Sequence, residues 1–177
     1  MDLAEASDAP GYHRRMHVRL ARAGDAEVIR SIYNAEVTGS TATFDLVPHT
    51  REEQLAWLAD HRGPYPAIVA LDGDDAVLGF GSLSAYKDRP SYATTVENSV
   101  YVDSAHRGRG VGRALLMELV ELAGQHGFHS MIARIGGDNQ VSIGLHQACG
   151  FTVVGVEREV GRKFNRWLDV VVLQRML

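Results

Sequence analysis

The chain has 177 residues, of which 45% are hydrophobic and 23% charged, and its formal net charge is −4. This length fits one domain with a proper core, and the interspersed acids and bases argue against a nucleic-acid-binding stripe. The sequence has no apolar run of the roughly 18 residues that a membrane span needs, and its single cysteine, Cys149, excludes an intramolecular disulfide. The acidic first ten residues lack the apolar core of a signal peptide, so we expect a cytoplasmic protein without a membrane partner.

The hydrophobic pattern predicts a single folded domain over residues 16–177, after a flexible extension at 1–15 that Pro10-Gly11 interrupts. Apolar residues at helical spacing predict helices at 25–37, 50–60, 110–125 and 140–148. The second of these begins with a capping box, Thr50-x-x-Glu53, and residues 38–48 before it read as a loop. Alternating or continuous apolar runs predict strands at 16–21, 65–71, 76–85, 94–102, 128–135, 151–160 and 167–176. The order β-α-α-β-β-β-α-β-α-β-β predicts an α/β (α+β) fold with helices packed on a mixed sheet.

A strand followed by a glycine-rich turn and a helix is the most informative pattern in the chain. The strand ends in Val96-Glu97-Asn98-Ser99-Val100-Tyr101-Val102, and Arg107-Gly108-Arg109-Gly110-Val111-Gly112 follows. Backbone N–H groups in such a turn, together with a helix N-terminus, bind phosphate groups. The P-loop is excluded, because Arg113 and Ala114 follow the last glycine instead of Lys and Ser or Thr. The dinucleotide fingerprint is disfavoured, because the glycine spacing is G-x-G-x-G and the next strand ends without an acid.

Two motifs in the chain resemble those of the GNAT (Gcn5-related) N-acetyltransferase superfamily. Residues 107–112 resemble its acetyl-CoA pyrophosphate motif, and Asn139-x-x-Ser142-x-x-Leu145-His146-x-x-x-Gly150-Phe151 resembles its last helix. Segments 87–92, 95–102 and 161–169 resemble the phosphinothricin / methionine sulfoximine (sulfone) N-acetyltransferase branch, and the likeness covers about residues 17–177. The branch tends to have histidine at the position of His146, where many GNAT enzymes have tyrosine. The resemblance implies a mostly antiparallel sheet of about seven strands with about four helices, in which strands four and five splay apart around the pantetheine arm.

The resemblance also implies an activity: acetyl-CoA-dependent acetylation of the α-amine of small amino-acid-like substrates, by direct attack in a ternary complex. Phosphinothricin, methionine sulfoximine and methionine sulfone are the substrates expected, and a homodimer is expected as the assembly. Two alternatives stay open, namely an acetyltransferase for a polyamine or aminoglycoside and a non-catalytic acyl-CoA-binding regulatory module. Lys87 and Arg89 argue mildly against a cationic substrate, and Glu97 argues against a module without turnover. The physiological role is open between detoxification, as in antibiotic or herbicide resistance, and amino-acid metabolism.

Glu97 is the candidate base, because the amine must lose its proton before it can attack an acyl group. The apolar neighbours Val96 and Val100 predict partial desolvation, which raises a carboxyl pKa toward neutrality. The alternative is a carboxylate that only binds the substrate amine. His146 is a candidate for protonating the departing thiolate, with a structural role as its alternative. A backbone N–H on the strand of Val100 is expected to stabilise the oxyanion.

The remaining predicted site residues fall into a cofactor group and a substrate group. The expected acetyl-CoA ligands are Val100, Tyr101, Val102, Arg107, Gly108, Arg109, Gly110, Val111, Gly112, Arg113 and Ser142. The expected substrate ligands are Phe44, Lys87, Asp88, Arg89, Tyr92, Glu97, Asn98, Ser99 and Asn139. An alternative role for Asn139 and Ser142 is helix capping. The alternative for the arginines is that they are solvated surface charges. The pairs His13/His17 and His126/His129 lack zinc spacing with a supporting carboxylate, so no metal is expected.

Overall fold

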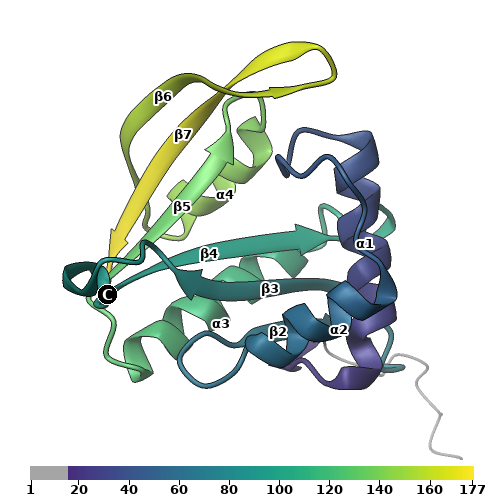
Figure 1. The fold of residues 1–177 in the computed structure, drawn as a ribbon. Coiled ribbons are helices and arrows are strands. Elements are labelled where there is room, and N and C mark those ends of the chain that lie inside the picture. Colours follow the sequence, from purple (N-terminus) through teal and green to yellow (C-terminus); the bar gives the residue numbers. More distant parts are fainter. Residues whose placement is uncertain (1–15) are drawn as a thin grey trace, which may run out of the picture.

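A computed structural model describes residues 16–177; the predicted extension at 1–15, with His13, lies outside the described residues. The described residues form one sheet of seven strands, in the order β1-β2-β3-β4-β5-β7-β6 (Figure 1). The strands are β1 His17–Leu20, β2 Ala67–Leu71, β3 Val77–Ala85, β4 Thr95–Val102, β5 Ser130–Gly136, β6 Thr152–Lys163 and β7 Arg166–Met176. The helices are α1 Ala26–Gly39, α2 Arg51–Asp60, α3 Val111–Gln125 and α4 Gln140–Ala148. The α/β (α+β) prediction, with a mostly antiparallel seven-stranded sheet and four helices, is confirmed.

Helices cover both faces of the sheet, and each face has its own hydrophobic core. Helices α3 and α4 pack on one face, where Leu115 and Leu119 contribute to a large core with Val96 of β4. Helices α1 and α2 cover the other face, where Ile29 packs with Phe80 of β3. Because strand side chains alternate between faces, Glu97, Ser99 and Tyr101 share the α1–α2 face, whereas Asn98 points toward α4.

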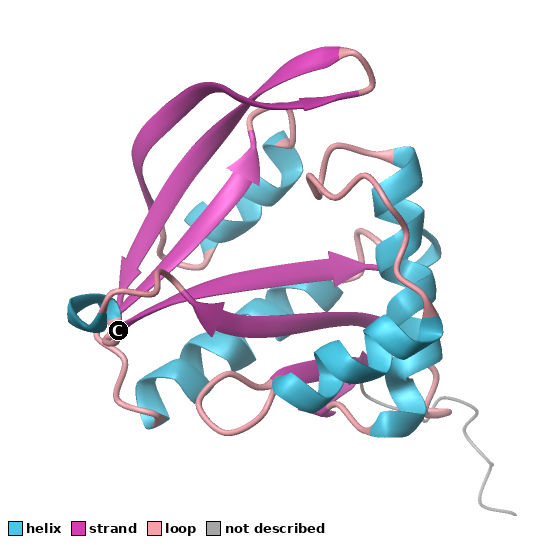
Figure 2. Cartoon of the chain, in the orientation of Figure 1, coloured by secondary structure: helices cyan, strands magenta, loops and turns pink. Residues whose placement is uncertain are grey.

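Strands β4 and β5 are the only parallel neighbours among the described strands, and they separate soon after they begin (Figure 2). Their ladder runs from Thr95↔Ser130 to Glu97↔Ile132, although β4 continues to Val102 and β5 to Gly136. Where the ladder ends, the side-chain amide of Asn98 donates to the Ile132 carbonyl at 3.1 Å. The predicted splay is therefore confirmed, and the edge of β4 beyond Glu97 has no strand partner on this side.

The β6–β7 hairpin is longer than predicted, because β6 was expected to end at residue 160 and in fact continues to Lys163. Phe164 and Asn165 form a two-residue turn in which both have positive φ, 50° and 58°. Such a turn matches the twist of its two flanking strands, so pairing continues as far as Lys163↔Arg166. Asn-Gly is the usual signal for this turn, and Phe-Asn gave no such signal.

Among residues 16–177, no helix has the length and apolar character needed to cross a membrane.

Candidate active site

The glycine-rich turn borders a cavity of about 610 Å³, named here the glycine-loop cavity. Most of the predicted cofactor ligands line it: Val100, Tyr101, Val102, Arg107, Gly108, Gly110, Val111, Gly112, Arg113 and Ser142. Arg109 does not line it. Its remaining wall comes from residues that no motif indicated, Glu36, Ser40, Thr41, Ala42, His106, Asp138 and Val141, together with Asn139 and Leu145 of the last-helix motif.

The backbone of the turn has the conformation that binding of an anion requires. Gly108 and Gly110 have φ of 73° and 82°, a region that other residues rarely adopt. The first intrahelical bond of α3 runs from the Ala114 N–H to the Gly110 carbonyl at 3.0 Å, so the N–H groups before it have no helical acceptor. These groups lie at the positive end of the α3 dipole and, with Arg113, fit the diphosphate of a nucleotide cofactor.

Arg107 is already paired inside the glycine-loop cavity. Its guanidinium forms an ion pair with Glu36, near the C-terminus of α1, and donates to the Val102 carbonyl at 3.3 Å. The Glu36 side chain is only 13% exposed, and it also accepts from the Ser40 hydroxyl at 2.5 Å. A phosphate group that binds Arg107 therefore has to compete with Glu36. Sequence reasoning missed Glu36, because it lies 71 residues from its partner.

A smaller cavity of about 60 Å³ lies at the gap between β4 and β5 and is named here the splay cavity. It is lined by Ala42, Asn98, Ser99, Val100, Tyr101, Ala133, Arg134, Ile135, Asn139, Ser142 and His146. Val100, Tyr101 and Ser142 also line the glycine-loop cavity, so the two cavities share a wall. Asn139 belongs to this wall too and caps α4, since its side-chain oxygen accepts from the Ser142 N–H at 3.1 Å.

His146 is 4% exposed and held from both sides of its ring. Its Nε2 lies 3.1 Å from Asn98 Oδ1, and its Nδ1 lies 2.8 Å from the Ser142 carbonyl. The bond from Asn98 to Ile132 fixes the amide orientation, so Nε2 faces the acceptor Asn98 Oδ1 while Nδ1 faces the acceptor Ser142 carbonyl. Burial lowers the pKa of His146, while the Ser142 carbonyl opposes that shift. Burial prevails, so the pKa of His146 is lowered, and the ring lies at the wall of the splay cavity.

Glu97 lines neither of these cavities; it directly precedes the splay-cavity residues Asn98 and Ser99 on β4, on the opposite face of the strand from Asn98. Burial raises the pKa of its carboxyl, nearby Arg134 lowers it, and Glu157 adds a smaller increase. Arg134 is itself paired with Glu157, which weakens its electrostatic stabilisation of the Glu97 carboxylate. The pKa of Glu97 is therefore raised, in the direction that its apolar neighbours predicted.

A third cavity, of about 310 Å³, lies between the sheet and the α1–α2 region and is named here the α1–α2 cavity. The sheet contributes Phe80, Ser82, Ser84, Ser99 and Tyr101, and the α1–α2 region contributes Tyr33, Asp45, His49, Gln54, Trp57 and His61. Ser99 and Tyr101 also line the splay cavity, so each of the three cavities shares a wall with the others. Of these eleven residues only Ser99 and Tyr101 were predicted, because the others share no motif.

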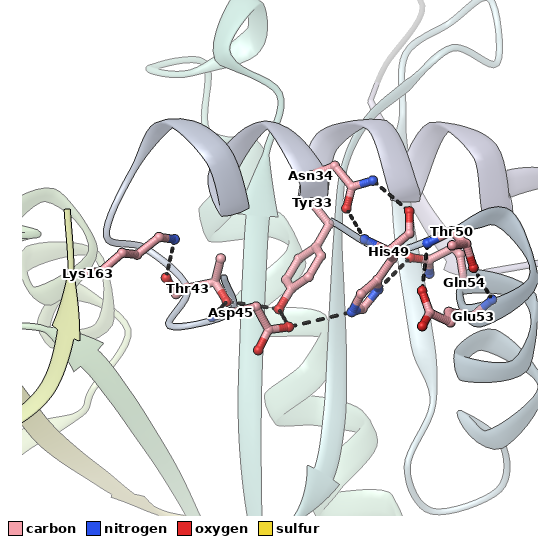
Figure 3. A network of polar contacts seen from close by, with 9 residues as sticks. All are labelled: Tyr33, Asn34, Thr43, Asp45, His49, Thr50, Glu53, Gln54 and Lys163. Atoms are coloured by element: carbon pink, nitrogen blue, oxygen red, sulfur yellow. Dashed lines mark hydrogen bonds and ion pairs between the residues drawn. The ribbon is translucent and has the colours of Figure 1, made fainter. Parts of the chain in front are cut away.

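Polar contacts organise the α1–α2 cavity (Figure 3). The Tyr33 hydroxyl donates to Asp45 Oδ2 at 2.7 Å and lies 2.9 Å from the Thr43 hydroxyl. His49 Nε2 lies 3.5 Å from the same Asp45 oxygen. Burial raises the pKa of Tyr33 strongly and that of Tyr101 to about 12, so both phenols stay protonated and can donate hydrogen bonds.

The loop at 40–45 forms walls of all three cavities and is held by a buried lysine. Lys163, at the end of β6, is 4% exposed and donates to the Thr43 carbonyl at 2.8 Å and to the Glu36 carbonyl at 3.4 Å (Figure 3). Burial lowers the pKa of this ammonium, while Asp45 and Glu36 raise it. Thr41 adds a bond to Asp138 at 2.8 Å. The β6–β7 hairpin thus fixes a loop that lies more than one hundred residues away in sequence.

Comparison with known proteins identifies this arrangement, because residues 29–151 match the model of the acetyltransferase (GNAT) family. The chain belongs to the GNAT acetyltransferase family. It is 40% identical to the L-methionine sulfoximine/L-methionine sulfone acetyltransferase of Pseudomonas paraeruginosa, over 89% of this chain and 92% of the relative. It is also 40% identical to the phosphinothricin N-acetyltransferase of Streptomyces coelicolor, over 86% of this chain and 91% of the relative.

A solved GNAT structure shows the same fold. A phosphinothricin acetyltransferase from Sinorhizobium meliloti, determined in complex with acetyl-CoA, superimposes with a TM-score of 0.88 and is 40% identical. The match covers 92% of this chain and 88% of that one. The chain is therefore an acyltransferase by family. Within residues 16–177, no three His, Cys, Asp or Glu side chains gather so as to hold a metal ion.

Some predicted substrate ligands of this GNAT enzyme, Glu97 among them, line none of the three cavities. Lys87, Asp88, Arg89 and Tyr92 lie exposed on the loop between β3 and β4, at the Glu97 end of those strands. The Lys87 ammonium lies 4.7 Å from the ring centroid of Tyr86 and 5.2 Å from that of Tyr92. Phe44 is 38% exposed, and its ring lies against Gly161 of the hairpin. Their roles in substrate binding stay predictions.

Proposed function

We propose that this GNAT enzyme transfers the acetyl group of acetyl-CoA to the α-amine of a small amino-acid-like substrate by direct attack. The observation that carries the proposal is the series of three adjoining cavities, in which the splay cavity shares lining residues with each of the other two. Such a series allows donor and acceptor to be bound at the same time, which direct attack requires. Glu97 directly precedes the splay-cavity residues Asn98 and Ser99 on β4, so its carboxylate would lie near the point where the two meet.

Acetyl-CoA fits the glycine-loop cavity and the splay. The free amides at the start of α3, with Gly108, Gly110 and Arg113, would hold its diphosphate. The unpaired edge of β4 would bond the pantetheine amides as an added strand would. The bound cofactor supplies an activated acetyl thioester, and a backbone N–H near Val100 would stabilise the oxyanion.

Glu97 accepts the proton of the amine, directly or through water, and its raised pKa makes it a stronger base than an ordinary carboxylate. The amine nitrogen forms a bond to the acetyl carbon, and the carbon–sulfur bond breaks. The departing thiolate takes a proton from a general acid, for which His146 is the candidate, since its ring lines the splay cavity.

The proposed substrates are those named for the relatives, namely phosphinothricin, methionine sulfoximine and methionine sulfone. The α-carboxylate of such a substrate would bind Lys87 or Arg89, since both cations lie on the loop that leads into the Glu97 strand. We further propose that the enzyme is a cytoplasmic homodimer. The exposed apolar residues of the β6–β7 hairpin, Val154, Val160 and Trp167 among them, support self-association, and sedimentation velocity tests it.

The test is release of free thiol from acetyl-CoA with a panel of amines. The panel contains phosphinothricin, methionine sulfoximine, methionine sulfone, ordinary amino acids, spermidine and an aminoglycoside. Glu97→Gln is assayed beside wild type, with Glu118→Gln on the exposed side of α3 as a control of equal charge change. We expect thiol release with the first three compounds and a fall of about 10²–10⁴-fold in kcat for Glu97→Gln alone. Release only with the polycations would refute the substrate, and equal rates in both variants would refute the base.

A further inference from the structure

We propose that the α1–α2 cavity receives the substrate side chain and selects a neutral hydrogen-bond-accepting group over an anionic one, with Asp45 as the specificity-determining residue. The inference rests on the proposed function and deepens it. Among the relatives, one group is named for methionine sulfoximine and sulfone and another for phosphinothricin. Methionine sulfone and phosphinothricin have nearly the same shape, since each ends in a tetrahedral centre with one methyl group and two oxygens. They differ in charge, because the sulfone is neutral and the phosphinate is an anion.

The position of the cavity suits a side chain that leaves the α-carbon near Glu97. Ser99 and Tyr101 are shared with the splay cavity, so the α1–α2 cavity begins where the acetyl group is transferred. The walls continue from there toward Trp57 and His61 of the α2 region. A cavity of about 310 Å³ lies at the lower end of the range for small-molecule sites, which fits one amino-acid side chain.

The floor of the cavity presents hydroxyl groups. Ser82 pairs directly with Ser99 across β3 and β4, and Phe80 pairs with Tyr101 in the same way. Because Phe80 packs against the α1–α2 core, alternation along the strands places both serine side chains on the same face as its ring. Hydroxyls can donate to the oxygens of a sulfone or sulfoximine.

The charge in the cavity is negative. Asp45 is the only carboxylate in its lining, and no lysine or arginine of the described chain lines it. His49 Nε2 lies 3.5 Å from Asp45 Oδ2, and the Nδ1 of His61 donates to the Trp57 carbonyl at 2.7 Å. The nearby cation, Lys163, is buried behind the loop and donates to two main-chain carbonyls. A phosphinate would therefore meet a carboxylate with no free cation to balance it, whereas a sulfone would not be repelled.

The test compares kcat/KM for methionine sulfone and phosphinothricin at saturating acetyl-CoA, in wild type, Asp45→Asn and Glu118→Gln. Asn keeps an acceptor for the Tyr33 hydroxyl, and Glu118→Gln makes the same charge change far from the cavity. We expect wild type to favour the sulfone by about tenfold or more, as a carboxylate–anion repulsion across a half-exposed site would give. Asp45→Asn should raise the value for phosphinothricin about three- to tenfold relative to that for the sulfone. Ser82→Ala should lower the sulfone value.

Equal or better use of phosphinothricin by wild type would overturn the inference, and so would an Asp45→Asn variant that changes both substrates alike. Turnover of neither compound, with turnover of a polyamine, would instead refute the proposed function. In that case a thermal-shift measurement still decides the inference. Stabilisation by methionine sulfone but not by phosphinothricin supports it, and equal or no stabilisation by the two compounds overturns it.

Discussion

Asn98→Ala should destabilise this acetyltransferase more than a typical substitution on a strand. Asn98 is 6% exposed and makes two hydrogen bonds, one to the Ile132 carbonyl and one to His146 Nε2, both at 3.1 Å. Alanine would leave both partners buried without an acceptor or donor, at a cost of about 1–3 kcal/mol each. Water can enter the space and offset part of that cost, so we expect a loss of about 3 kcal/mol. For a chain of this length the melting temperature should fall by roughly 6–12 °C.

Thermal and urea unfolding followed by circular dichroism measure this loss. Ser99→Ala is the matched control, because it changes the next residue of β4 on the opposite face and should cost less than about 1 kcal/mol. His146→Ala and the double variant complete a cycle, in which the shared bond should appear as a coupling of about 1 kcal/mol or more. A melting temperature within about 2 °C of wild type, or two losses that simply add, would refute the proposed role of Asn98 in joining β4, β5 and α4.

Three further changes test the electrostatics, the glycine turn and the buried lysine. Burial raises the pKa of Glu97 in the folded protein above its unfolded value, so ionisation of this carboxyl destabilises the fold above the folded pKa. Glu97→Gln should therefore raise the melting temperature at pH 8, and the gain should shrink toward pH 5. A gain that is independent of pH would contradict this. Gly110→Ala, at φ 82°, should lower the free energy of unfolding by about 1–2 kcal/mol and raise the KM for acetyl-CoA. The control Gly124→Ala, with open space around its Cβ, should leave stability unchanged or raise it by up to about 1 kcal/mol in the same assays. Lys163→Met should lower stability by about 1–3 kcal/mol and speed limited proteolysis between residues 40 and 45; an unchanged cleavage pattern would show that the bond to Thr43 does not hold the loop.

The elements could be predicted because their signals are local. Apolar spacing located all four helices, and the capping box at Thr50 marked the start of α2, where the Thr50 hydroxyl accepts from the Glu53 N–H at 3.2 Å. The β6–β7 turn escaped prediction for an equally local reason: Phe164 adopts a positive φ, which its residue type does not signal.

The candidate site likewise combines residues that local sequence signals predicted with residues that only long-range contacts bring together. The ligands of the glycine-loop cavity are close in sequence, so a motif predicted them, and ten of those that were named line it. Glu36 pairs with Arg107 across 71 residues, and Lys163 holds Thr43 across 120. No sequence spacing reports such pairs, because loops and a hairpin from opposite ends of the chain meet only after the sheet has formed.

The sequence by itself determined the order of elements, the glycine-rich turn before α3 and the placement of Glu97 on the strand beside it. These features depend on side-chain periodicity and on backbone freedom within a few residues, and both can be read along the chain. Only the tertiary structure decided that Asp45, His49 and three strand serines enclose one cavity beside Glu97. Packing of α1 and α2 on one face of the sheet creates that enclosure, and packing depends on contacts between residues that are distant in sequence.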